Sequence, residues 1–476
     1  MEDLVTPFIV VASLLTITLI VVDHIRGNAE ILSIRNIALV GFLIFQVFST
    51  RLGLTPRSDF SYNLNAPEET VGRWVVWCSI FLVAFAIAYR VGFGAKFAAR
   101  FVPVPSAKLG MASGWALMLL LTACAGALKI LPIPYVAALA NYTSVGLASV
   151  SAGIAGWLWA PRLFNPAIAI PAIAIVGINA FVVQIGEFGR RPLVSIGAGM
   201  LWGMYYSSFR YLSFPNMMAR AALVTIPPAM LLGAYTSVRS WGNIGSGQQI
   251  VSDIVEDGDA TVLFKEMFAQ DTTVVGQWLM EYADRGQYET RPLFSIRYFF
   301  EFPIPRQLYE FVGAEKPWPV STQMADLSNR KGVKRGNTGV TNPAGVVGNA
   351  TVEGGVFALI IYAIVGAAVF RFFDQYLRNN PRTPYLVLPI GSCLGQVLGI
   401  ARGEVPVFMF IFVWTTGTVT ITMIYASKIL TRMFPQLAEA DEVYDIDETG
   451  EYFDYGAEGY ADYGEETYEE RPPRLA

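Results

Sequence analysis

Two short turns between hydrophobic stretches of this chain combine arginines with carboxylates. One turn holds Glu187, Arg190 and Arg191, and the other holds Arg402 and Glu404. Guanidinium groups form forked hydrogen bonds that suit phosphate oxygens. A carboxylate beside them can accept a proton from a hydroxyl group. The two turns therefore contain the groups that a transfer reaction from a phosphorylated donor requires.

A long polar segment, residues 239–352, supplies further candidates. It is far too long for a simple connector, so we expect it to have structure and function of its own. Its second half is rich in Pro, Gly and Asn, a composition typical of a binding loop. Basic residues gather there: Arg285, Arg291, Arg297, Arg306, Lys316, Arg330, Lys331, Lys334 and Arg335. The first carboxylate after the segment is Glu353, at the opening of the next apolar stretch.

The composition shows what must position these residues. Hydrophobic residues make up 54% of the 476 and charged residues only 15%, which is typical of a protein embedded in a membrane. Continuous apolar runs favour helices over the alternating strands of a barrel. We predict an all-α, polytopic bundle of about eleven spans, at 5–23, 33–50, 71–89, 109–128, 134–159, 166–185, 193–209, 219–238, 353–371, 384–400 and 405–427.

The distribution of basic residues predicts the orientation of the bundle. The loops on one side carry about twice as many lysines and arginines as the short loops on the other, and the richer side is the cytoplasm. This places the N-terminus outside, the C-terminus in the cytoplasm and residues 239–352 outside. Arg190, Arg191 and Arg402 are separated from that segment by even numbers of spans, so all share its face.

The remaining features define four parts of the chain. Spans are expected in 1–238 and 353–432, a large extracytoplasmic domain in 239–352, and a disordered acidic, tyrosine-rich cytoplasmic tail in 433–476. That tail is either a solubilising extension or a regulatory arm. The three cysteines fall inside predicted spans and His24 is the only histidine, so we expect neither a metal centre nor a cofactor.

The order of short motifs resembles the O-antigen polymerase and ligase superfamily of bacterial envelope glycosyltransferases. The resemblance covers about the C-terminal 40% of the chain and its overall plan of spans with one large external loop. The motifs that carry it are Ile304-Pro305-Arg306, Lys316-Pro317, Gly339, Asn342-Pro343, Gly348, Gly355 and Arg402-Gly403. The family joins sugar chains carried on undecaprenyl pyrophosphate, so the resemblance implies a lipid-linked oligosaccharide as donor and acceptor.

Two departures from the family pattern bear on the reaction. The family often has glutamate directly after the glycine, where this chain has Asn349, and the nearest carboxylate is Glu353. The ligase branch is thought to use a loop histidine as base, and this segment contains none. The missing histidine favours a polymerase, or a branch with different base chemistry, over a ligase.

The expected mechanism requires cations for the pyrophosphate leaving group and a base for the acceptor hydroxyl. We assign Glu353 as the first candidate base, Glu187 as the second and Glu404 as the third. Sugar contacts are assigned to Trp318 and Asn342. The pyrophosphate is assigned to Arg190, Arg191, Arg306, Lys316 and Arg402, with Arg402 also counted as catalytic.

Each of these assignments has a structural alternative. Glu187 and Glu404 could serve only to pair Arg190 and Arg402, and Trp318 could be an interfacial anchor. For the whole chain, the alternatives are a ligase, a transporter or flippase of lipid-linked sugars, and a membrane scaffold. The polymerase hypothesis places the protein in the bacterial inner membrane, with a chain-length regulator or flippase as a further partner and no nucleic acid.

Overall fold

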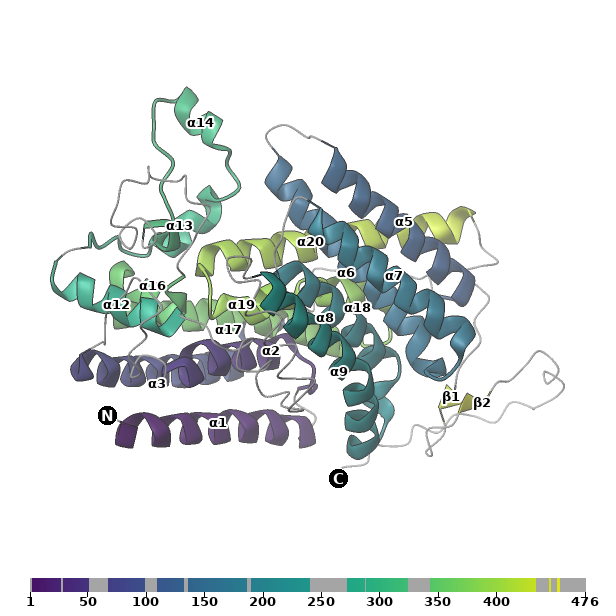
Figure 1. Ribbon diagram of the computed structural model, residues 1–476, viewed down its shortest axis with the longest axis horizontal. Coiled ribbons are helices and arrows are strands. Elements are labelled where there is room, and N and C mark those ends of the chain that lie inside the picture. The colour runs from purple at the N-terminus through teal and green to yellow at the C-terminus, as the bar shows by residue number, and fades with distance from the viewer. Residues whose placement is uncertain are drawn as a thin grey trace.

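The computed structural model describes residues 2–26, 29–50, 67–98, 109–131, 136–185, 190–239, 272–286, 288–323 and 343–433, with two short strands beyond them. The described chain is helical apart from strands β1 (Asp445–Ile446) and β2 (Tyr452–Phe453), which pair antiparallel. The rest of the predicted tail lies outside the described residues. Figure 1 shows the helices gathered into one bundle, with the described part of the polar segment at one end of it.

Seven helices of the described chain are long and apolar enough to cross a membrane, since a span needs roughly 20 residues. The prediction of an all-α, multi-pass membrane protein is confirmed at this level. The seven are α1 (Glu2–Ile25), α3 (Glu68–Val91), α5 (Met111–Ile130), α6 (Ala137–Trp159), α7 (Pro166–Gln184), α17 (Val356–Asn379) and α20 (Val405–Met433).

The other predicted spans are also helical but differ from a simple span. The stretch predicted at 33–50 forms α2 (Ile34–Phe42) and the π-helical turn η1 (Leu43–Val47), within a shorter apolar helix. The stretch at 384–400 is broken into α18 (Pro384–Gly391) and α19 (Leu394–Ile400). Those at 193–209 and 219–238 lie in α8 (Arg190–Ser207) and α9 (Phe214–Arg239), which are not among the seven.

Helix α6 is the centre of the bundle. Small residues let its neighbour α8 approach it closely. A Cβ added to Gly203 of α8 would lie 2.0 Å from the carbonyl oxygen of Gly153, and one on Gly156 would lie 2.2 Å from that of Met200. Close backbone approach through glycine is a common way for helices to associate in membranes. These glycines fix α8, and therefore Arg190 and Arg191 at its start, against α6.

The described part of the polar segment folds as short helices at one end of the bundle (Figure 1). These are α12 (Thr272–Asp284), α13 (Phe294–Glu301), α14 (Arg306–Phe311) and α16 (Gly345–Glu353). Val275 and Leu279 of α12 pack in one cluster with Phe294, Val320 and Val352. Gly354 and Gly355 have φ values of 130° and 64°, and this turn, which other residues would adopt only with strain, leads from α16 into α17.

Candidate functional site

Glu353 lies at the junction between α16, α17 and the polar segment. Its carboxylate accepts hydrogen bonds from the backbone N–H of Ser295 (2.6 Å), the hydroxyl of Ser295 (2.9 Å) and the hydroxyl of Tyr362 on α17. The backbone N–H of Leu293 also donates to the Glu353 carbonyl oxygen (2.8 Å). Glu353 therefore holds the start of α13 against the end of α16.

The environment of Glu353 changes its acidity. The residue is 1% exposed, and it forms no ion pair with any residue that the structure describes. Burial raises the pKa of this carboxyl to about 7, because desolvation outweighs the opposing effect of the Tyr362 and Ser295 donors. A carboxyl with such a pKa exchanges its proton near neutral pH, as a general base must.

Glu404, directly before α20, holds the next part of the polar segment. Its two carboxylate oxygens accept the backbone N–H groups of Val320 (2.7 Å) and Ser321 (2.8 Å). The side chain is buried, and burial raises its pKa above the ordinary value for glutamate. These contacts make Glu404 the anchor of a short helical turn at residues 320–323.

Tyr288 relates the two glutamates to each other. Burial raises the pKa of Tyr288, and the negative charges of Glu404 and Glu353 both add to that rise. Glu404 also raises the pKa of Glu353 slightly. The hydroxyl of Tyr288 donates to Gln323 (2.5 Å). The two carboxylates are thus close enough to influence each other, and we call this end of the bundle the carboxylate end.

Arg191 of α8 and the turn that contains Arg402 meet at the ring of Phe408 on α20. The guanidinium of Arg191 lies 4.4 Å from the centre of this ring. The turn that contains Arg402 packs on the same ring, since a Cβ added to Gly403 would lie only 1.9 Å from it. The structure therefore brings Arg191 and the Arg402 turn together although more than 200 residues separate them in sequence.

A third group forms from Arg306, Lys316 and Trp318 of the polar segment. The Arg306 guanidinium lies 3.5 Å from the centre of the Trp318 ring and so covers one of its faces. The Lys316 ammonium donates to the carbonyl oxygens of Phe302 (2.8 Å) and Ile304 (2.6 Å). Burial, followed by the charge of Arg306, lowers the pKa of Lys316. Lys316 thus stabilises the backbone of its own loop.

The remaining sequence candidates are placed only in part. Glu187 and Asn342 lie outside the described residues. Arg190 begins α8, but its side chain is not among those described. Within the described ranges, no cluster of three or more His, Cys, Asp or Glu residues could hold a metal ion.

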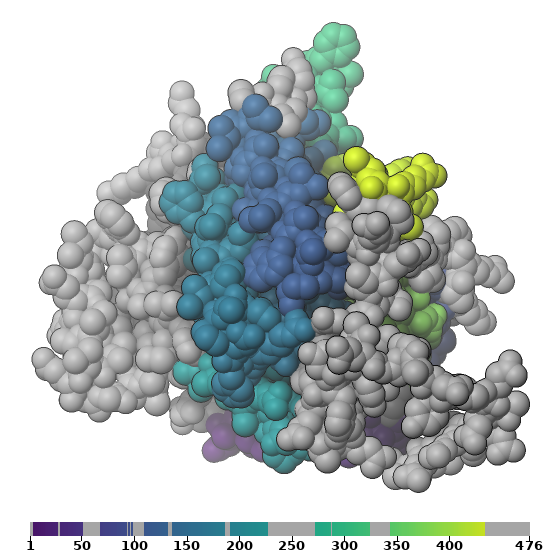
Figure 2. Space-filling view, turned by 90° about the vertical axis from the view of Figure 1, so that its right-hand side faces the viewer, coloured from purple at the N-terminus to yellow at the C-terminus, as the bar shows by residue number. Residues whose placement is uncertain are grey.

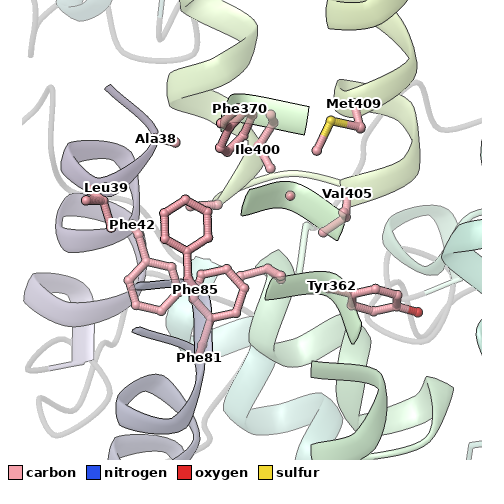
Figure 3. A pocket seen from close by; sticks show the side chains of 13 residues that line it. Ala38, Leu39, Phe42, Phe81, Phe85, Tyr362, Phe370, Ile400, Val405 and Met409 are labelled. Carbon is pink, nitrogen blue, oxygen red and sulfur yellow. The ribbon is translucent and has the colours of Figure 1, made fainter. Parts of the chain in front are cut away.

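An apolar pocket adjoins the carboxylate end (Figure 3). Its cavity volume is about 40 Å³, and it lies between α2, α3, α16, α17, α19 and α20. Phe42, Phe81 and Phe85 form its aromatic wall, and in Figure 3 the Tyr362 hydroxyl points away from these rings. Because that hydroxyl donates to Glu353, Tyr362 is shared between the pocket and the buried carboxylate.

The sequence reasoning missed three residues of this arrangement, Ser295, Tyr288 and Tyr362. A tyrosine inside an otherwise apolar span was a signal for Tyr362, because a buried hydroxyl needs a hydrogen-bond partner. Ser295 and Tyr288 carried no signal, since their roles come from contacts made across many residues.

Comparison of the chain with protein families, curated proteins and solved structures finds no match.

Proposed function

We propose that this protein is a membrane glycosyltransferase that polymerises undecaprenyl-pyrophosphate-linked oligosaccharide repeat units. The observation that supports this most strongly is Glu353, a buried carboxylate with a pKa of about 7, at a junction with the loop that resembles polymerase and ligase loops. The pocket beside it is lined by apolar and aromatic side chains, the kind of surface that a hydrocarbon chain contacts.

In the proposed reaction, a hydroxyl oxygen of the acceptor sugar attacks the anomeric carbon of the donor glycan. The bond from that carbon to the pyrophosphate oxygen breaks, and undecaprenyl pyrophosphate leaves. Glu353 accepts the proton of the attacking hydroxyl. For this, the acceptor hydroxyl replaces the hydroxyl of Tyr362 or Ser295 as a hydrogen-bond donor to the Glu353 carboxylate.

Arginines stabilise the charge that develops on the leaving pyrophosphate. Arg191 and Arg402 are the first candidates, because Arg191 and the turn that contains Arg402 meet at Phe408. Arg306 remains a candidate for an earlier contact with the same group, since its side chain is exposed on the polar segment. Lys316 contributes mainly by holding the loop in shape.

The proposal includes the finer topology. The chain would cross the bacterial inner membrane about eleven times, with the short helix Ile34–Thr50, the broken pair α18–α19, α8 and α9 completing the spans. The N-terminus and the polar segment would lie in the periplasm and the C-terminal tail in the cytoplasm. A chain-length regulator or a flippase would be the protein partner.

The test is a polymerisation assay on the full chain in nanodiscs. The purified protein is incubated with native lipid-pyrophosphate-linked oligosaccharides, with and without a chelator, and products are separated as a ladder on a gel. We expect a ladder that persists with chelator and is lost in Arg402→Ala and strongly reduced in Arg306→Ala. Arg285→Ala is the matched control, because Arg285 is exposed directly after α12 and pairs only with Glu281 among the described residues.

Two results would redirect the proposal. Consumption of lipid-linked donor onto a different acceptor, without a ladder, would identify a ligase. No consumption by folded protein, combined with movement of the labelled lipid across the bilayer, would identify a flippase or transporter.

A further inference from the structure

A lobe formed by residues 294–318, with α13 and α14, projects from the carboxylate end. It stands clear of the bundle in Figure 1, and in Figure 2 its green atoms rise above the other coloured helices. Large apolar side chains are exposed on it: Phe311 is 87% exposed and Val312 is 70% exposed at its tip, and Leu308 of α14 and Phe300 of α13 are also exposed. Exposed apolar surface of this kind marks a site of interaction.

The base of the lobe packs on the first turns of two candidate spans. Phe299 and Phe302 lie 5.6 and 5.4 Å from Phe410 of α20, measured between ring centres. Phe302 also lies 6.2 Å from Tyr142 of α6. Phe410 and Tyr142 both fall within the second turn of their spans. The base of the lobe therefore lies beside the start of these spans, and the end of a span is where hydrocarbon gives way to headgroups.

The polar residues of the lobe also suit that depth. Arg306 stacks on Trp318, and Lys316 is half-buried beside them. Tryptophan is enriched where a protein crosses the headgroup layer, and arginine and lysine there can reach lipid phosphates. A water-exposed lobe would gain nothing from so large an apolar tip, whereas a membrane surface would bury it.

We propose that the α13–α14 lobe docks on the phospholipid surface of the leaflet at the carboxylate end. Phe311 and Val312 enter the acyl region, and Arg306 and Trp318 lie in the headgroup layer. The inference concerns the lobe alone and does not depend on the proposed glycosyltransferase activity. Its consequence is that the bilayer holds the loop that leads to Val320 and Ser321, the backbone donors to Glu404.

The experiment measures the depth of single labelled residues in the full chain. In a Cys124→Ser background, which removes the exposed native thiol and leaves the buried Cys78 and Cys393, Phe311→Cys is labelled with an environment-sensitive fluorophore. The protein is placed in nanodiscs of phosphatidylcholine with or without brominated acyl chains. We expect loss of emission in the brominated lipid. Glu289→Cys is the control, since Glu289 is 79% exposed beside α13 and should keep its emission.

A second position and a second quencher keep the result decisive. Val312→Cys should behave as Phe311→Cys does, and both substitutions fall on exposed side chains that the fold does not need. Quenching of both labels by aqueous iodide, with no effect of bromine, would place the tip in water and overturn the proposal. Protection from both quenchers would show that protein covers the tip, such as a second copy of the chain, and would overturn it equally.

Discussion

The two ends of the helix bundle both bury carboxylates, but among the described residues only one end pairs a buried carboxylate with an arginine. At the end where α1 finishes and α2 begins, Asp23 pairs with Arg35 at 2.5 Å, and Glu30 pairs with Arg210 at 3.0 Å. Asp374 of α17 is also buried at this end, and its donors are neutral: the backbone N–H groups of Ile34 and Arg35 and the hydroxyl of Tyr89. We call this the arginine end.

At the carboxylate end the donors are neutral. Glu353 accepts from Ser295 and Tyr362, and Glu404 accepts two backbone N–H groups. Neither forms an ion pair with any residue in the described part of the chain. Tyr362 and Asp374 lie twelve positions apart on the same helix α17, so the two ends are separated by roughly 18 Å of helix.

This difference in partners distinguishes carboxylates that hold the fold together from carboxylates that can exchange a proton. A buried carboxylate paired with an arginine acts as a fixed part of the fold, because removal of either partner leaves a buried charge. A buried carboxylate with only neutral donors has a raised pKa and can exchange a proton. The arginine end therefore has the character of a clamp that joins α1, α2 and α17, whereas the carboxylate end is the reactive site that we propose.

The sharpest test of the carboxylate end is Glu353→Gln. The amide can still bond Ser295 and Tyr362, but it cannot accept a proton, so we expect the polymerisation rate to fall about 10²- to 10⁴-fold with an unchanged unfolding temperature. The ladder assay in nanodiscs measures the rate. Unchanged activity would show that Glu353 serves only to hold α13.

The corresponding test of the arginine end is Asp23→Ala. It leaves the buried guanidinium of Arg35 without its carboxylate, so we expect the free energy of unfolding to fall by about 3–5 kcal/mol. Unfolding in detergent, followed by circular dichroism, measures this. The double variant Asp23→Ala with Arg35→Met should recover most of the loss, and a single variant as stable as the parent would contradict the clamp.

The pH dependence of the polymerisation rate tests the carboxylate end without a substitution. Glu353 must be ionised to act as base, so the rate should rise about tenfold per pH unit below an apparent pKa near 7 and level off above it.

The same group affects stability in the opposite direction. The pKa of Glu353 is higher in the folded protein than in the unfolded chain. At pH values between these two pKa values the folded state binds more protons, so the free energy of unfolding should fall as the pH rises towards 7. Both trends should disappear in Glu353→Gln, and a rate independent of pH from 5 to 8 would argue against a titrating base.

The smallest effect is expected at an exposed ion pair. Arg73 of α3 bonds Asp284 of α12, and both side chains are about a third to a half exposed. Because water screens such a pair, Arg73→Ala should change the free energy of unfolding by less than about 1 kcal/mol. The same detergent unfolding experiment checks it, and a loss as large as that of Asp23→Ala would remove the contrast between buried and exposed pairs.

Much of the fold could be predicted because hydrophobicity is a local property of the chain. Each span can be recognised from roughly 20 consecutive apolar residues, and all seven candidate spans coincide with predicted ones. The stretch at 384–400 could be recognised as apolar, but its break between Gly391 and Leu394 could not, since breaks in membrane helices depend on neighbours that satisfy the backbone.

The sequence by itself determined that this is a helical, multi-pass membrane protein and that Glu353, Glu404 and several arginines are its candidate chemical groups. Only the tertiary structure decided their partners. Ser295 reaches Glu353 across 58 residues and Val320 reaches Glu404 across 84, and Arg35 meets Asp374 across 339. Whether a carboxylate stays charged depends on burial and on which donors surround it. Those depend on how helices distant in sequence pack together, which no local pattern records.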